Sequence, residues 1–127
     1  MLATVTEDIP LANATHYLLA RNGRGKTTLL KTLSGLLRQR AGRYSTHGLC
    51  QFIGDEFYFD RELKSEAIFK ALIPKAARDA ALHLADQLEL DTGKEFGKLS
   101  FGNRKKVGLL VAEFRVSEEG PNLLFYD

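Results

Sequence analysis

Residues 20–28 read A-R-N-G-R-G-K-T-T, and an apolar run with helical spacing follows directly. The stretch matches the phosphate-binding pattern A/G-x-x-x-x-G-K-S/T at Ala20, Gly25, Lys26 and Thr27. Glycines let the backbone turn its N–H groups toward phosphate oxygens, and the dipole of the following helix favours the same anion. We therefore expect a nucleoside triphosphate here, with the Lys26 ammonium reaching its phosphates and the Thr27 hydroxyl ligating Mg²⁺.

The residues that flank this loop give it the expected context. His16–Leu19 is a short, β-prone apolar run, which predicts a strand before the loop. The leucines after the loop fall on one helical face and predict a helix that reaches Leu37; they are Leu29, Leu30, Leu33, Leu36 and Leu37. Strand, glycine loop and helix in this order are what the motif requires, and the alternative is an ordinary glycine turn.

A second motif lies about seventy residues later, where residues 99–103 read L-S-F-G-N. Apolar residues then recur at i, i+3, i+4 and i+7, which predicts an amphipathic helix; they are Val107, Leu110, Val111 and Phe114. A turn of the type Ser100-x-Gly102 that opens a helix offers a hydroxyl and free backbone N–H groups. The sequence therefore predicts a second anion site at this turn.

Two short apolar runs predict buried strands. Residues 49–53 read L-C-Q-F-I, and residues 123–127 read L-L-F-Y-D. The second run indicates a parallel strand that presents the Asp127 carboxylate at its C-terminal edge, where open α/β sheets bind ligands. Between the runs, Arg61–Ile73 and Lys75–Leu90 have helical spacing, with Pro74 as the break.

Together these segments resemble the ATP-binding domain of ABC transporters. The glycine loop is similar to the Walker A motif, L-S-F-G-N to the signature L-S-G-G-Q, and L-L-F-Y-D to Walker B. The resemblance covers about residues 17–127 and implies an α/β fold, namely a P-loop NTPase core with a parallel sheet and a helical subdomain at about residues 56–102. It also implies that residues 1–127 form a single partial domain, incomplete at both ends.

The resemblance assigns roles to particular residues. The implied nucleotide-binding residues are Asn22, Gly23, Arg24, Gly25, Lys26, Thr27 and Thr28. Lys26 and Asp127 are the implied catalytic residues, and Thr27 and Asp127 the implied metal ligands. Ser100 and Gly102 are implied to contact the γ-phosphate of ATP held by a second copy, since two such domains sandwich two nucleotides head to tail.

Several positions depart from the family pattern. Ala20 stands where the family usually has Gly, and Arg24 replaces a small residue, so that its side chain lies either over the phosphates or in solvent. Phe101 and Asn103 replace Gly and Gln of the signature. Asp55 aligns with the Gln of the Q-loop, from which it could still contact Mg²⁺ or water.

The implied function is that of an ATP-binding subunit of an ABC transporter, coupling ATP binding and hydrolysis to transport through a separate membrane subunit. The implied cofactors are ATP and Mg²⁺, and the implied assembly is a homo- or heterodimer. The implied location is cytoplasmic, peripheral on the inner face of the cell membrane. The family's catalytic Glu and switch His belong after Asp127, so hydrolysis by this chain stays open. The alternative is a nucleotide-binding and dimerisation module that does not hydrolyse ATP.

Composition and the remaining side chains limit the classes of partner that we expect. The net charge of +2 is too small to argue for nucleic acid, and we interpret the arginines at 38, 40 and 43 and the basic run 104–106 as solvated faces. A single cysteine, Cys50, permits no internal disulfide, and neither a secretory signal nor a membrane-spanning run is expected. The aromatic residues 57–59 either receive the membrane partner or pack on the helical subdomain.

Overall fold

The computed structural model describes residues 5–54, 59–116 and 120–127. Its regular elements, in chain order, are α1 (Lys26–Leu33), β1 (Leu49–Ile53), α2 (Ser65–Leu72), the 3₁₀ turn η1 (Lys75–Ala77), α3 (Arg78–Gln87), the 3₁₀ turn η2 (Phe96–Lys98), α4 (Phe101–Phe114) and β2 (Asn122–Tyr126).

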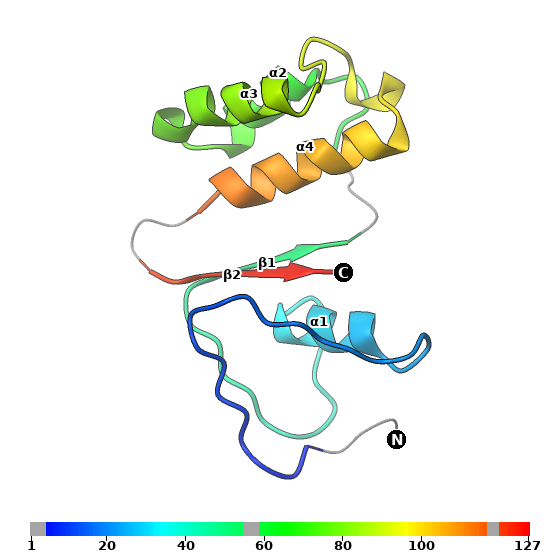
Figure 1. Ribbon diagram of the computed structural model, residues 1–127, viewed down its shortest axis with the longest axis vertical. Coiled ribbons are helices and arrows are strands. Elements are labelled where there is room, and N and C mark those ends of the chain that lie inside the picture. The colour runs from blue at the N-terminus through cyan, green and yellow to red at the C-terminus, as the bar shows by residue number, and fades with distance from the viewer. Residues whose placement is uncertain (1–4, 55–58, 117–119) are drawn as a thin grey trace.

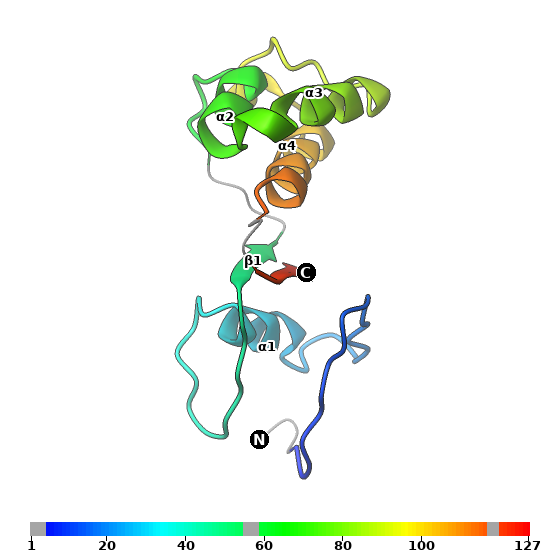
Figure 2. The same ribbon diagram turned by 90° about the vertical axis from the view of Figure 1, so that its left-hand side faces the viewer.

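These elements form three tiers (Figure 1). Helices α2, α3 and α4 make a lobe at one end, β1 and β2 lie side by side in the middle, and α1 lies with the N-terminal segment at the other end. In the view turned by 90°, α4 and α1 remain on opposite sides of the strands (Figure 2). The two helices therefore cover opposite faces of the small sheet, which is the layering of an α/β protein.

The two strands are parallel, with Leu49 opposite Asn122 and Ile53 opposite Tyr126. This confirms both predicted strands and the parallel sheet. The two strands come together at Gly48. Its φ is 92°, and an added Cβ there would collide with the carbonyl of Pro121. The next residue, Leu49, donates its N–H to that carbonyl at 3.0 Å. A side chain at position 48 would therefore prevent the close approach that starts the pairing.

Successive side chains of β1 point to opposite faces of the sheet, as the period of a strand requires. Gln51 reaches α4, where its Nε2 donates to the carbonyls of Ala112 and Arg115 at 3.0 Å each. Phe52 faces α1, and the ammonium of Lys31 lies 5.5 Å from the centre of its ring. The sheet is thus tied to one layer through an amide and to the other through an aromatic ring.

The hydrophobic core lies in the helical lobe. Its buried members are Ile68, Phe69, Ile73, Ala81, Ala85, Leu90, Phe96, Leu99, Val107, Leu110 and Val111. The apolar face predicted for residues 107–114 accounts for the part of α4 that enters this core. By contrast, none of the residues of α1 is buried. No helix in the described part of the chain is both long and apolar enough to cross a membrane.

Four sequence-based expectations about the elements were wrong. His16–Leu19 is not a strand, since the described sheet consists of β1 and β2 alone; Tyr17 and Leu19 are 83% and 88% exposed. The helix after the loop ends at Leu33 rather than Leu37, because Gly35 takes a left-handed φ of 82°.

In the helical lobe, the first predicted helix begins later than expected, at Ser65. Residues 60–63 form a turn closed by the N–H of Leu63 on the carbonyl of Asp60, and Lys64 is extended. The second predicted helix is divided, because η1 precedes α3 and the α-helix ends at Gln87.

Candidate functional site

The phosphate-loop candidate is a tight turn at the beginning of α1. Gly23 and Gly25 have φ angles of 76° and 82°, a region that glycine adopts without a Cβ penalty. Gly25 immediately precedes α1, and its carbonyl accepts the N–H of Leu29 at 2.9 Å. The N–H groups of the first helical turn therefore have no partner within the helix and stay available to an anion.

The side chain of Lys26 folds back across this loop. Its ammonium donates to the carbonyl of Ala20 at 2.8 Å and to that of Arg21 at 3.2 Å. These bonds hold the cation against the loop rather than letting it extend into solvent. A positive charge is thus placed beside the free N–H groups of the turn, so that both features favour a negatively charged ligand.

Asp127 lies beside the first turn of α1, 100 residues from Thr27 in the chain. The Thr27 hydroxyl is 2.7 Å from Asp127 Oδ2 and 2.9 Å from Oδ1, so it donates to the carboxylate as a whole. The N–H of Asp127 donates to the carbonyl of Ile53 at 2.9 Å, which continues the β1–β2 ladder by one residue. The sheet therefore fixes the backbone from which this carboxylate reaches the loop.

Tyr126 precedes this aspartate. Tyr126 is 51% exposed, and its partial burial, followed by the negative charge of Glu113, raises the pKa of its phenol above the ordinary value. Both causes disfavour the phenolate, so Tyr126 is neutral at pH 7 and adds no charge beside the carboxylate.

The second candidate motif opens α4. Ser100 is the N-cap, and its Oγ accepts the N–H of Asn103 at 3.3 Å. Gly102 is exposed, and an added Cβ there would meet nothing within 4 Å. Phe101, between them, is 65% exposed. The turn consequently presents a hydroxyl, backbone N–H groups and an aromatic ring on the surface of the helical lobe.

The structure gathers the predicted site residues in two separate places. Residues 22–28 and Asp127 lie together on the α1 side of the strands, whereas Ser100 and Gly102 lie in the helical lobe on the other side (Figure 1). Asp55, the remaining predicted metal ligand, lies outside the described residues. One copy of the chain therefore carries two candidate half-sites on different parts of its surface.

Two basic side chains near the second motif form hydrogen bonds that the sequence did not indicate. The run 104–106 was interpreted as a solvated face, yet Arg104 donates to the carbonyl of Gly97 and Lys106 to that of Leu88, each at 2.7 Å. No sequence signal marks these bonds, because they depend on how α4 packs. The arginines at 38, 40 and 43 are exposed, as expected.

Phe59 is the described member of the aromatic run 57–59, and its ring packs edge-on against Phe96 at 5.3 Å between centroids. This contact agrees with the alternative in which the aromatic run packs on the helical lobe. Phe57 and Tyr58 lie outside the described residues.

Comparison with known proteins shows which family the chain resembles. The model of the ABC transporter family matches residues 11–127. The sulfate/thiosulfate import ATP-binding proteins CysA of Yersinia pseudotuberculosis and Yersinia pestis are each 48% identical to the chain over 48 residues. That region is 38% of this chain and 13% of either relative, so the chain spans a small part of their length. No solved structure gives a significant match. Since the family match covers most of its residues, the chain belongs to the ABC transporter family.

Proposed function

We propose that the chain forms the ATP-binding part of an ABC transporter subunit, which couples ATP binding and hydrolysis to transport through a separate membrane subunit. Family membership and the similarity to ATP-binding proteins of sulfate import support this function. The observation that carries it is the contact between Thr27 and Asp127, which joins the phosphate-loop candidate to the strand-end carboxylate at 2.7 Å.

In this proposal, the phosphates of ATP lie on the turn at residues 22–28. The free N–H groups of the turn donate to phosphate oxygens, and the Lys26 ammonium moves from the carbonyls of Ala20 and Arg21 to the more negative phosphates. Neutral carbonyls are weaker partners for an ammonium than phosphate oxygens, which favours the exchange. The loop thereby binds and orients the triphosphate for transfer to water.

The donor atoms of Thr27 and Asp127 suit Mg²⁺. A hydroxyl and a carboxylate are hard oxygen ligands, and Mg²⁺ in phosphate sites is bound by one or two such groups together with waters and phosphate oxygens. Within the described residues, no three His, Cys, Asp or Glu side chains gather into a richer metal site. When bound, the ion would neutralise phosphate charge; Thr27 and Asp127 would hold it, with Asp55 as a further candidate.

The separation of the two half-sites supports pairing of two such domains. Ser100 and Gly102 are exposed in the helical lobe, away from the loop of their own chain, and are thus accessible to a nucleotide held by another copy. We propose a homo- or heterodimer that binds an integral membrane subunit at the inner face of the membrane, without a nucleic-acid partner.

The proposal is tested first by calorimetric titration of the chain with Mg-ATP. Lys26→Ala is expected to weaken binding about 100-fold, roughly 2.7 kcal/mol, because two charge-assisted bonds to phosphate are lost. Lys31→Ala is the matched control, since Lys31 lies on the same helix but its ammonium faces Phe52. Equal affinity of the Lys26 variant and the parent chain would contradict the assignment of the loop.

A second measurement separates the two kinds of function. Phosphate release from Mg-ATP is measured on the same preparations, and hydrolysis requires release by the parent chain and none by Lys26→Ala. ATP binding without phosphate release would contradict hydrolysis and leave a nucleotide-binding and dimerisation module.

A further inference from the structure

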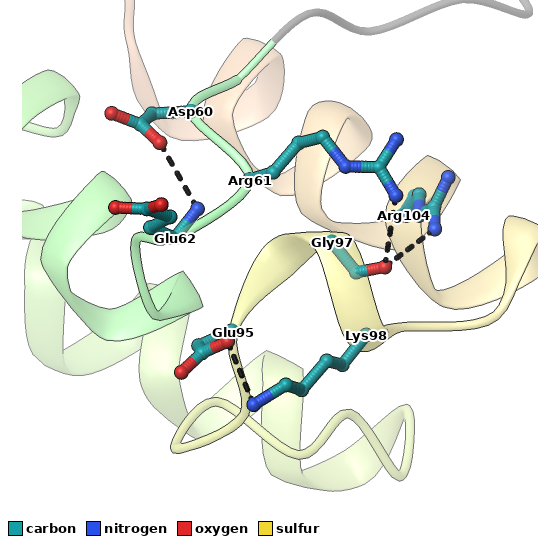
Figure 3. Close-up of polar contacts among 7 residues, drawn as sticks. All are labelled: Asp60, Arg61, Glu62, Glu95, Gly97, Lys98 and Arg104. Carbon is teal, nitrogen blue, oxygen red and sulfur yellow. Dashed lines mark hydrogen bonds and ion pairs between the residues drawn. The ribbon is translucent and has the colours of Figure 1, made fainter.

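Three segments of the helical lobe meet at the peptide groups of Gly97 (Figure 3). The N–H of Gly97 donates to the carbonyl of Arg61 at 2.8 Å. Its carbonyl accepts Nη2 of Arg104 at 2.7 Å and lies 3.5 Å from Nη2 of Arg61. The adjacent Phe96 donates its N–H to the carbonyl of Leu63 at 2.8 Å. The turn before the signature motif is thus tied both to residues 61–63 and to α4.

Glycine is required at position 97 for this arrangement. An added Cβ would lie 2.9 Å from Cβ of Arg61 and 3.0 Å from its carbonyl oxygen, closer than real Cβ atoms normally come to backbone. Gly97 therefore lets the two segments approach closely enough for the backbone bond and for the two guanidinium groups to converge.

The Arg104 side chain links the first turn of α4 to the turn before the signature motif, because it binds the carbonyl of Gly97. Its backbone N–H donates to the carbonyl of Ser100 at 2.9 Å, which is the ordinary first bond of the helix. The bond to Gly97 is therefore the contact that depends on the arginine. Leu99, between Gly97 and Ser100, is 4% exposed, which anchors this segment to the core.

The position of Arg104 is also costly to maintain. Its guanidinium carbon lies 5.9 Å from the centre of the Phe96 ring, and its Nε is buried without a hydrogen-bond partner in the described part of the chain. A buried donor without a partner destabilises a fold, so packing and the bond to Gly97 must offset that cost.

We propose that Arg104 is a positioning residue, which holds Ser100 and Gly102 in the geometry that receives a nucleotide phosphate. This inference rests on the proposed function, in which that nucleotide is held by a second copy of the chain. Arg104 does not touch the nucleotide; its side chain acts by fixing the carbonyl of Gly97, three residues before Ser100. Arg61 extends the same link to the segment that follows β1.

Amide hydrogen exchange of the ATP-free chain tests the positioning itself. The Asn103 amide, which donates to Ser100 Oγ, reports on the turn. Arg104→Ala is expected to speed its exchange about tenfold, because the variant loses the stabilisation of one charge-assisted hydrogen bond. Arg78→Ala is the matched control, because Nε of Arg78 also donates to a carbonyl in the lobe, that of Ile73 at 3.0 Å, but away from the signature turn. Equal exchange in the two variants would overturn the inference.

ATP-driven pairing, followed by sedimentation with Mg-ATP, gives the second readout. Arg104→Ala is expected to keep the ATP affinity of the single chain but to weaken pairing about tenfold, and Arg104→Lys, which can still donate to Gly97, to restore part of it. Normal pairing of Arg104→Ala would overturn the inference. A parent chain that binds ATP but never pairs would contradict the proposed dimer, and the Asn103 exchange would then decide the role of Arg104.

Discussion

At the scale of single residues, Glu89 is the clearest case of backbone strain. Its φ of 55° is the only positive value among the described non-glycine residues. It follows α3, where the N–H of Glu89 binds the carbonyl of Asp86 and that of Leu90 binds the carbonyl of Ala85, both at 2.9 Å. These two bonds define a Schellman motif, in which the left-handed position favours glycine.

Glu89→Gly is therefore expected to stabilise the chain by about 0.5–1 kcal/mol, since the Cβ penalty is removed while both end bonds are kept. Urea denaturation followed by circular dichroism should show a higher midpoint. Glu89→Ala serves as the control, because alanine keeps the Cβ and should give no such gain. A destabilised glycine variant would mean that the Glu89 side chain outweighs the strain.

At the scale of the elements, Gln51 joins β1 to the C-terminal end of α4. That helix end presents carbonyls without helical partners, and the Gln51 amide satisfies those of Ala112 and Arg115. Gln51→Leu preserves the size of the side chain but removes both donors, so we expect a loss of about 1–3 kcal/mol in unfolding free energy.

The matched control for Gln51 is Gln39→Leu. Nε2 of Gln39 also donates to a carbonyl, that of Gly42 at 3.0 Å, but in an exposed segment where water can replace it. Denaturation curves should show a clearly larger loss of unfolding free energy in Gln51→Leu than in Gln39→Leu. Equal, small losses would show that α4 is held on the sheet by apolar packing alone.

The elements also show which features of the fold can be predicted from the sequence. The runs at 49–53 and 123–127 were predicted correctly as parallel strands, because such strands are short, continuous and apolar. The predicted burial was wrong except at Ile53, since the other residues of β1 and β2 are partly or fully exposed. His16–Leu19 has the same appearance and is not a strand, since pairing depends on a neighbour that local composition does not specify. The helix after the loop was predicted too long, because leucine spacing continues through Gly35, where the backbone leaves the helix.

At the scale of the whole molecule, the contact between Thr27 and Asp127 could be anticipated, although 100 residues separate them. Resemblance to a family assigned both residues to one metal ion, which requires them to be close. No comparable rule relates Arg61, Gly97 and Arg104. Their association follows from the packing of α4 on the helical lobe, and neither spacing nor composition reveals it.

The two ends of the molecule differ in how they are stabilised, which leads to the last prediction. The helical lobe holds the core cluster, whereas α1 buries none of its residues and is linked to β2 by the Thr27 hydroxyl. The α1 end should therefore open locally, without unfolding of the lobe. Ligand binding slows only those openings that destroy its site.

Saturating Mg-ATP should consequently slow amide exchange in residues 23–33 and 122–127 and leave the amides of Ala81 and Ala85 unchanged. At a ligand concentration of 100 times Kd, the expected slowing in the protected segments is about 100-fold, from about 2.7 kcal/mol of linkage. Exchange mass spectrometry at a protein concentration below that of pairing measures this, with Lys26→Ala as the control. Equal slowing in α3 would show that the lobe and the phosphate-loop end unfold as one cooperative unit, because the ligand would then suppress a single opening shared by both.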